Sequence, residues 1–441
     1  MNLSNKKVAF YTLGCKLNFA ETSTISRFFT DKEIKIVKFN EIADYYVINT
    51  CSVTSNANKK SRNAIVRATK KNPNAIIIVT GCYAQLKPHE IKNICGVDYI
   101  FGANNKDDIE KIIETSSKLK KVEITTTDHK DMKSFFPAVS KGDRTRAFLK
   151  VQDGCDYFCA YCTIPYARGR SRNLPIKEII KQAEFVAANN IKEIIISGVN
   201  IGDFGKSSNE KFFDLLKKLV EVKNIQRFRI GSIEPNLLTD EMIEFIANQE
   251  KIMPHFHIPL QAGSDEVLKK IKRKYNTVLF KSKIEKIKSL MPNAFIGIDL
   301  IVGVNGETKE NFNETIEFVK SLDISYIHYF QYSDRENTPA INFEPKISPT
   351  EKHERAKIID EISKSKHKSF LSSQINKKFQ VLFESSKKGN KMFGFTNNYI
   401  KVVSNYNKSL VNQIVDVEIV DFYDDETMQI KILWWKTYKY L

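Results

Sequence analysis

Short apolar runs alternate with stretches of helical periodicity over residues 1–115, a pattern that predicts strands connected by helices. Three of the predicted strands end alike, because a cysteine follows each of them: Cys15, Cys51 and Cys82. A βα alternation is typical of an open parallel sheet, and the carboxyl ends of parallel strands lie along one edge. The sequence therefore predicts that three cysteines from distant parts of the chain meet at one edge of the sheet.

The spacing of the apolar runs changes after a polar stretch, residues 116–142, which we interpret as a linker. Beyond it, six further apolar runs alternate with helical stretches: 148–151, 193–197, 227–232, 255–258, 295–302 and 326–330. Six βα units predict a partial barrel, (β/α)6, that is open on one side and carries its functional residues in the loops after the strands. We place this central domain at residues 141–370.

The tail, residues 374–441, contains alternating β-like runs separated by turns. This pattern predicts a small closed β-barrel of the oligonucleotide-binding type, so we expect an α/β protein with three domains. The aromatic residues of the tail either stack on bases or fill the barrel core, and they include Phe393, Phe395, Tyr399, Trp434 and Trp435.

The net charge of the chain indicates a binding partner. Its 441 residues include 69 Lys and Arg against 52 Asp and Glu, a net charge of +17 that favours binding to nucleic acid. Two basic segments follow cysteines, Lys59 to Lys71 and the arginines Arg168, Arg170 and Arg172, and we expect them to contact phosphates unless they are only solvated faces. No apolar run reaches the roughly 18 residues of a membrane span, and the start lacks an apolar signal core, which predicts a cytoplasmic protein that binds no membrane.

The most specific motif is C-x3-C-x2-C, formed by Cys155, Cys159 and Cys162 directly after the first predicted barrel strand. Thiolates are the ligands of iron–sulfur clusters, and three of them leave one iron of a 4Fe-4S cube open to a small molecule. A zinc site is the alternative, but zinc needs a fourth ligand, and the next histidine is His255. The remaining thiol, Cys95, stands among apolar residues, and we expect a small buried side chain there.

With Tyr161 at its aromatic position, this motif resembles the signature of the radical S-adenosylmethionine (SAM) superfamily, C-x3-C-x-aromatic-C. The segments around two upstream cysteines, Thr-Leu-Gly-Cys-Lys-Leu-Asn and Asn-Thr-Cys-Ser-Val-Thr, narrow the resemblance to the methylthiotransferases, and the tail resembles their TRAM RNA-binding domain. Within that family, the two segments resemble the branch that acts on N6-threonylcarbamoyladenosine in tRNA. The alternatives are the branches that act on N6-isopentenyladenosine or on a ribosomal protein aspartate, and a non-catalytic iron–sulfur sensor that binds RNA.

The resemblance implies a tRNA-modifying enzyme that adds a methylthio group to C2 of N6-threonylcarbamoyladenosine at position 37, on the 3′ side of the anticodon. It implies two 4Fe-4S clusters, a catalytic one on the C-x3-C-x2-C motif and an auxiliary one whose ligands are Cys15, Cys51 and Cys82. SAM is the implied co-substrate. The implied partners are the tRNA anticodon stem-loop, a sulfur donor and an electron donor such as flavodoxin or ferredoxin.

The loops after the central strands supply the candidates for contact with SAM, because ligands of such barrels bind at the carboxyl ends of the strands. They are Tyr161, Ser197, Gly198, Asn200, Ser232, Glu234, Gln261 and Gly303, with Ile301 near the adenine. Since radical chemistry requires that water be excluded, we expect a dry cavity between the first two domains.

Overall fold

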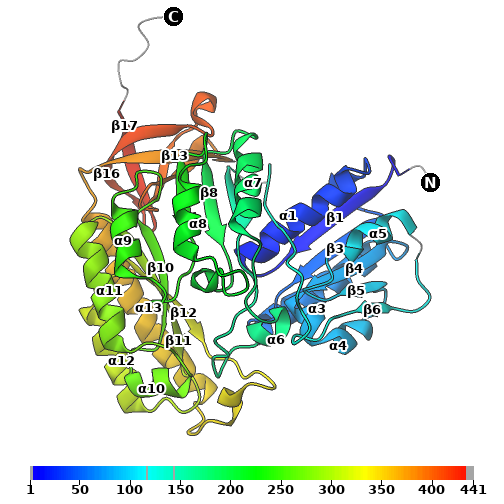
Figure 1. The fold of residues 1–441 in the computed structure, drawn as a ribbon, viewed down its shortest axis with the longest axis horizontal. Helices are drawn as coiled ribbons and strands as arrows, with labels where there is room; N and C mark the ends of the chain where they lie inside the picture. Colours follow the sequence, from blue (N-terminus) through cyan, green and yellow to red (C-terminus); the bar gives the residue numbers. More distant parts are fainter. Residues whose placement is uncertain (1–2, 116–117, 143–144, 434–441) are drawn as a thin grey trace, which may run out of the picture.

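The computed structural model describes residues 3–115, 118–142 and 145–433, which form three packed units along the chain (Figure 1). The first unit is a six-stranded sheet in which every neighbouring pair is parallel, with the order β2-β1-β3-β4-β5-β6. This arrangement confirms the predicted open parallel sheet. Its elements are β1 (Lys7–Thr12), α1 (Lys16–Thr30), β2 (Lys35–Val37), β3 (Tyr45–Thr50), α2 (Ser55–Lys71), β4 (Ile76–Gly81), α3 (Cys82–Leu86), α4 (Pro88–Lys92), β5 (Tyr99–Phe101), α5 (Asp108–Thr115) and β6 (Glu123–Thr125).

The two central strands of this sheet, β3 and β4, are buried along their whole length. Helices cover both faces of the sheet, so these strands read as continuous apolar runs instead of alternating ones. Phe29 of α1 and Ile113 of α5 pack against one face, and Ile65 of α2 packs against the other. The edge strand β6 pairs with β5 and comes from the stretch interpreted as a linker, so the sheet extends past residue 115.

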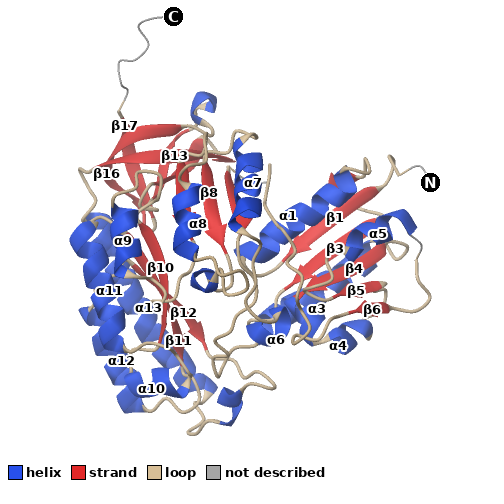
Figure 2. Ribbon diagram, viewed as in Figure 1, coloured by secondary structure: helices blue, strands red, loops and turns tan. Residues whose placement is uncertain are grey.

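The second unit contains all six predicted strands, arranged as two parallel sheets of three, β7-β8-β9 and β10-β11-β12. Two isolated bridges, Phe228 to Ile252 and Ser232 to His257, connect the sheets, so the barrel is partial and open as expected. Its helices lie along the outer side of the strands (Figure 2). The elements are β7 (Arg146–Lys150), α6 (Ile164–Arg168), α7 (Ile176–Ala187), β8 (Glu193–Ser197), α8 (Phe212–Leu219), β9 (Arg227–Ile230), α9 (Asp240–Ala247), β10 (His255–Gln261), α10 (Asp265–Lys270), α11 (Thr277–Leu290), β11 (Phe295–Val302), α12 (Lys309–Ser321), β12 (Tyr326–Gln331) and α13 (Pro349–Ser372).

The third unit is a closed five-stranded barrel with the order β13-β14-β15-β17-β16, which confirms the predicted fold of the tail. Its strands are β13 (Lys378–Lys388), β14 (Lys391–Thr396), β15 (Lys401–Asn405), β16 (Ile414–Asp424) and β17 (Thr427–Ile432). Across all three units, none of the described helices combines the length and the apolar character needed to cross a membrane.

The aromatic residues of the third unit differ in their surroundings. The rings of Phe395 and Tyr399 stack 5.0 Å apart, and an arginine of β7 lies over Phe395, so both rings fasten the barrel to the central unit. Phe393 is half-buried, with a lysine ammonium above its ring. Trp434 and Trp435 lie outside the described residues. Of these aromatic residues, Phe393 therefore remains the described candidate for contact with a base.

Candidate active site

The three upstream cysteines lie together at the carboxyl edge of the N-terminal sheet. Cys15 stands between β1 and α1, Cys51 follows β3, and Cys82 is the first residue of α3 after β4. Since β1, β3 and β4 are adjacent and parallel, the three side chains leave the sheet at the same edge. Burial raises the pKa of Cys51 to about 11, and the neighbouring Cys82 and Cys15 thiols act in the same direction.

The second cysteine triad occupies a single loop after β7. Backbone N–H groups of Tyr157 and Ile164 donate to the sulfur atoms of Cys155 and Cys162 at 3.5 and 3.4 Å. Burial raises the pKa of Cys155 to about 12, and it raises the pKa of Cys162 as well. N–H groups that point at sulfur favour the thiolate, which is the form that binds a metal.

Both triads suit an iron–sulfur cluster. Cys15 is exposed, whereas burial raises the pKa of Cys51 and of Cys155, so a metal that binds these two thiols displaces their protons, because only the thiolate is a ligand. Within the described residues, no group of three or more His, Cys, Asp and Glu side chains is arranged around a single ion. Each triad offers three thiols, whereas a structural zinc site needs four protein ligands, so the donor sets fit a cluster better than zinc.

Arg273 joins the loop triad to one of the residues expected to contact SAM. Its guanidinium donates to the Cys159 sulfur at 3.0 Å and pairs with the Glu234 carboxylate. Burial raises the pKa of Glu234, and Arg273 opposes that shift. A cation and a carboxylate are thereby held in fixed positions beside the triad.

A second buried group of charges connects the N-terminal unit to the central one. The Glu21 carboxylate of α1 is fully buried and lies 2.8 Å from the Lys150 ammonium, 2.9 Å from the Arg168 guanidinium and 3.2 Å from the Lys106 ammonium. Arg168 also pairs with Asp153 at 2.9 Å. Although burial opposes ionisation, Arg168 and the other cations hold the pKa of Glu21 and of Asp153 well below the usual range of a carboxyl group.

Arg168 extends this buried network to the upstream cysteines. It is the last residue of α6, shortly after the loop triad, and its positive charge lowers the pKa of the Cys82 thiol, against burial, which raises it. Counting Arg172, four buried cations face two carboxylates, which leaves an excess of positive charge beside Cys82. Thiolates bound to a cluster balance such an excess, and this supports the fit of the upstream triad.

The network corrects the prediction for two of the three basic-motif arginines. Arg168 and Arg172 are buried and ion-paired, so neither of them is available to a phosphate. The sequence misled because a buried, paired arginine and a surface arginine look alike in a basic motif. The Arg170 side chain is 68% exposed, and Lys59, Lys60, Lys70 and Lys71 of α2 are exposed as well, so these five remain candidates for phosphate contact.

Among the residues expected to contact SAM, Asn200 has the clearest need for a ligand. It is 3% exposed, and both polar atoms of its side chain lack a partner within the described residues. Gln152 fixes the surrounding loop, because its Oε1 accepts from two consecutive backbone N–H groups at 2.9 Å, and Gly198 lies against the same side chain. The Ser197 hydroxyl, in contrast, donates to a carbonyl of its own strand at 3.2 Å.

The other predicted SAM residues divide into two sets. Tyr161, Gln261 and Ile301 line one cavity of about 290 Å³ at the mouth of the barrel. Ser232 takes part in the bridge between β9 and β10, and the Gly303 N–H donates to a glutamate carboxylate at 3.0 Å. The structure therefore brings the first three together around a space, whereas the last two serve contacts within the barrel.

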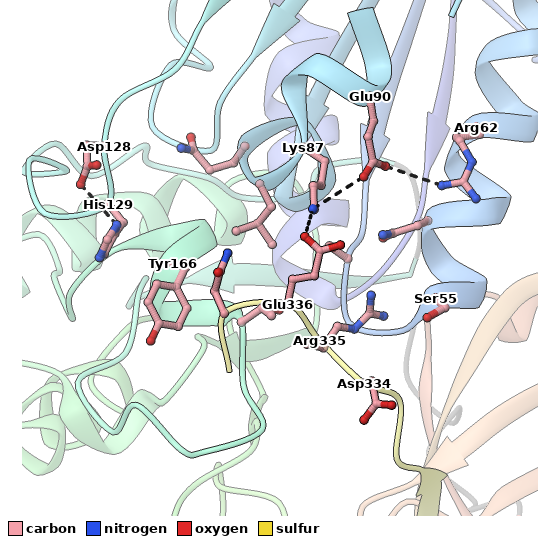
Figure 3. Close-up of a pocket in the computed structure, with 16 residues that line it drawn as sticks. Ser55, Arg62, Lys87, Glu90, Asp128, His129, Tyr166, Asp334, Arg335 and Glu336 are labelled. Atoms are coloured by element: carbon pink, nitrogen blue, oxygen red, sulfur yellow. Dashed lines mark hydrogen bonds and ion pairs between the residues drawn. The ribbon is translucent and has the colours of Figure 1, made fainter. Parts of the chain in front are cut away.

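A larger cavity, of about 660 Å³, lies between the N-terminal unit and the central unit (Figure 3). Arg62 and Glu90 reach it from α2 and α4, and Lys87 reaches it from the junction between α3 and α4. Arg335 and Glu336 reach it from the loop after β12. The cavity has the position expected from the sequence. Its wall is mainly polar, in contrast to the dry cavity expected, whereas the smaller cavity at the barrel mouth is more apolar.

Comparison with known proteins gives matches in the two regions that carry the triads. Residues 7–102 match the family described as Uncharacterized protein family UPF0004, and residues 149–319 match the radical SAM superfamily. The Threonylcarbamoyladenosine tRNA methylthiotransferase MtaB of Bacillus subtilis is 38% identical over 423 residues, which cover 94% of this chain and 93% of that protein. The chain belongs to the radical SAM methylthiotransferases.

Two further comparisons extend this result. The tRNA-2-methylthio-N(6)-dimethylallyladenosine synthase of Alkaliphilus oremlandii is 34% identical, with 95% of this chain and 91% of that protein covered. Among solved structures, the radical SAM methyltransferase TsrM from Kitasatospora setae matches 76% of this chain and 74% of its own with a TM-score of 0.55 and 13% identity, which shows a shared fold alone. As a radical SAM enzyme, this methylthiotransferase uses a 4Fe-4S cluster and SAM.

Sequence reasoning missed three residues of the methylthiotransferase site: Glu21, Arg273 and Arg335. None of them belongs to a metal-binding pattern, and each meets its surroundings through segments far away in the chain. One signal was available for Glu21, because it is the only acidic residue in the helix that follows Cys15. A glutamate is almost never fully buried unless it is paired, so an acid on an otherwise uncharged helix face predicts a partner.

The prediction for Cys95 is wrong, because its side chain is exposed. The residue lies in the turn after α4, where the Thr69 hydroxyl donates to its carbonyl oxygen at 3.3 Å. The preceding residue, Ile94, takes the inward position against the core. An apolar neighbourhood in the sequence does not tell which of two consecutive residues faces inward.

Proposed function

We propose that this methylthiotransferase adds a methylthio group to C2 of N6-threonylcarbamoyladenosine at position 37 of tRNA. The observation that carries the proposal is the pair of cysteine triads, one in each of two units that enclose a cavity of about 660 Å³. The 38% identity to a threonylcarbamoyladenosine tRNA methylthiotransferase over nearly the whole chain favours this substrate.

The proposal includes two 4Fe-4S clusters, one on each triad: Cys155, Cys159 and Cys162 for the catalytic cluster, and Cys15, Cys51 and Cys82 for the auxiliary one. When bound, the clusters supply the electron that cleaves SAM and an iron that holds the sulfur to be transferred. Each triad leaves one iron without a cysteine ligand, which is the property that both tasks require.

The side chains around the triads hold and orient the reactants. Asn200 offers two unpartnered polar atoms to SAM, and Arg273 fixes the Glu234 carboxylate beside the loop triad. The buried pairs between Glu21 and Arg168 hold the two units in a constant relation. Such positioning converts an encounter between bound reactants into a reaction within one complex.

We assign tRNA binding to exposed cations near the triads and to the C-terminal barrel, which we propose to be a TRAM domain. Lys59, Lys60 and Arg170 are exposed and would contact phosphates, which orient the anticodon stem-loop without selecting a base. Phe393 is the described aromatic residue that remains for stacking. A sulfur donor and an electron donor, such as flavodoxin or ferredoxin, complete the set of partners.

Mass spectrometry of digested tRNA from cells with and without this gene tests the proposal. The expected result is the loss of 2-methylthio-N6-threonylcarbamoyladenosine when the gene is removed, with restoration by a plasmid copy. The 34% identity to a dimethylallyladenosine synthase makes N6-isopentenyladenosine the second candidate. Loss of 2-methylthio-N6-isopentenyladenosine, with 2-methylthio-N6-threonylcarbamoyladenosine retained, would overturn the substrate assignment but leave the proposed chemistry intact.

A further inference from the structure

Arg335 is a buried cation for which the described residues supply no ion-pair partner. It lies on the loop after β12, is 9% exposed, and lines both the cavity of about 660 Å³ and the cavity of about 290 Å³. Its Nε and Nη2 atoms are buried without a hydrogen-bond partner within the described residues. Buried polar groups are nearly always hydrogen-bonded, and a buried charge without a counter-charge is costly, so this guanidinium is arranged for an anion from outside the chain.

The other strong cations of the larger cavity already have partners. The Lys87 ammonium pairs with Glu336 and lies 3.7 Å from the Glu90 carboxylate. The Arg62 guanidinium lies 4.0 Å from the same carboxylate of Glu90. In Figure 3, dashed lines join these four groups, and none of them reaches Arg335. Within the part of the chain that the structure describes, Arg335 therefore differs from these neighbours in having no carboxylate paired with it.

The two acidic residues next to Arg335 in the sequence bind other groups instead of its guanidinium. The Asp334 carboxylate accepts from the Asn305 amide at 3.0 Å, and Glu336 pairs with a lysine. Ser52, the residue after Cys51, lines the larger cavity together with Arg335, and Val53 lines the smaller one with it, which places the guanidinium near the upstream triad. An anion held by Arg335 would lie beside that triad, at the junction of the two cavities.

We infer that Arg335 binds an oxyanion of the substrate nucleotide, either the carboxylate of its threonyl group or its phosphate. A guanidinium presents parallel N–H donors, which match the two oxygens of a carboxylate or a phosphate. Arg335 thereby anchors the nucleotide between the space lined by the SAM candidates and the upstream triad. The inference rests on the proposed function and names a residue that positions its substrate.

Binding of three anticodon stem-loop RNAs to the holoenzyme tests the inference. The RNAs carry N6-threonylcarbamoyladenosine, the same nucleoside with its carboxylate converted to an amide, or unmodified adenosine. Arg335→Met should raise the Kd for at least the first RNA by about tenfold or more, because it removes a hydrogen-bonded charge pair. Arg335→Lys should recover part of the affinity, since it keeps the charge but not the paired donors.

The three RNAs distinguish the two sources of the oxyanion. If Arg335 binds the carboxylate, Arg335→Met weakens the binding of the threonylcarbamoyladenosine RNA alone. The wild-type enzyme then binds that RNA more tightly than the RNA whose carboxylate is converted to an amide. If Arg335 binds the phosphate, the variant binds all three RNAs more weakly to the same extent. The slope of log K against log salt concentration is then smaller in the variant by about 0.7. Lys181→Met is the control, because it removes an α7 cation that is already paired with Glu178 at 2.8 Å.

Three results overturn the inference. The first is an unchanged Kd for all three RNAs in Arg335→Met. The second is weaker binding of SAM by that variant, which would assign the guanidinium to SAM, and the third is loss of iron, which would assign it to the upstream triad. Failure of the proposed function has a different signature, because the wild-type enzyme would then form no methylthio product on the threonylcarbamoyladenosine RNA.

Discussion

The two cysteine triads are built in different ways. The loop triad comes from one short segment after β7, and its arginine, Arg273, belongs to the same unit. The upstream triad comes from the ends of three strands, and its arginine, Arg168, reaches Cys82 from the other unit. The loop triad is therefore complete within one unit, whereas the upstream triad acquires its full electrostatic surroundings only when the two units pack together.

The acids that face the two arginines differ as well. Arg168 meets two carboxylates, Glu21 and Asp153, whose side chains are 0% and 1% exposed. Arg273 meets one carboxylate, Glu234, whose side chain is 13% exposed. Removal of a cation costs most where the remaining acids have no access to water. We therefore expect Arg168, beside the upstream triad, to stabilise the fold more than Arg273 does.

The largest expected effect comes from removing one ligand of each triad. Cys15→Ala should still release 5′-deoxyadenosine from SAM but form no methylthio product, because the loop triad is intact. Cys159→Ala should do neither. Chromatography of the reaction products with mass detection measures both compounds. Full product formation by both variants would disprove the two-cluster proposal.

Arg168→Met should lower the free energy of unfolding by about 2–4 kcal/mol, because Glu21, Asp153 and Asn18 lose buried hydrogen bonds to its guanidinium, although Lys150 still pairs with both carboxylates. Iron retained by the upstream triad should decrease as well. Denaturant unfolding and iron analysis measure the two effects. Arg170→Met is the matched control, since the Arg170 side chain is 68% exposed, and it should stay within about 0.5 kcal/mol of the wild type. Equal losses in the two variants would contradict the role assigned to the buried network.

Gly81→Ala should reduce iron binding by the upstream triad, although it replaces none of the cysteines. Gly81 has a φ of +97°, and an added Cβ would lie 2.4 Å from the Thr50 carbonyl oxygen. Strain and overlap each cost about 1–3 kcal/mol, and relief of the overlap would displace Cys82. Iron content should fall while SAM cleavage persists. The control is Gly142→Ala, where φ is +80° but no atom of the described residues outside its chain neighbours lies within 4 Å of the added Cβ, so the iron content should not change.

Arg273→Met should have the smallest effect, a loss of about 1–3 kcal/mol near neutral pH, because Glu234 can take up a proton. Burial already raises the pKa of Glu234, and Arg273 is the group that lowers it. Without Arg273, the folded-state pKa rises further above the unfolded one, so stability is retained in acid and lost as pH rises through the folded-state pKa. Thermal unfolding at pH 5 and pH 8 measures this trend. A variant that lost more stability at pH 5 than at pH 8 would reverse the assigned sign.

The sequence predicted the strands, the closed tail barrel and the positions of the cysteines correctly for a local reason. Strand and helix periodicity, and the position of a cysteine at the end of an apolar run, are properties of short segments. Parallel pairing then aligns the carboxyl ends of β1, β3 and β4, so the grouping of Cys15, Cys51 and Cys82 followed from the sheet type alone. The exposure of Cys95 could not be predicted from the sequence, because it depends on how the turn after α4 packs against the core.

The sequence by itself determined the three-part α/β architecture, the two cysteine triads and the resemblance to the methylthiotransferases. Only the tertiary structure decided which charges are buried together and which stay unpaired. Glu21 and Arg168 are separated by 147 residues and yet lie 2.9 Å apart, whereas Arg335 has acids on both sides in the sequence and pairs with neither. The physical reason is that the energy of a charge depends on its distance to other charges and to water, and folding sets those distances between segments that no local pattern relates.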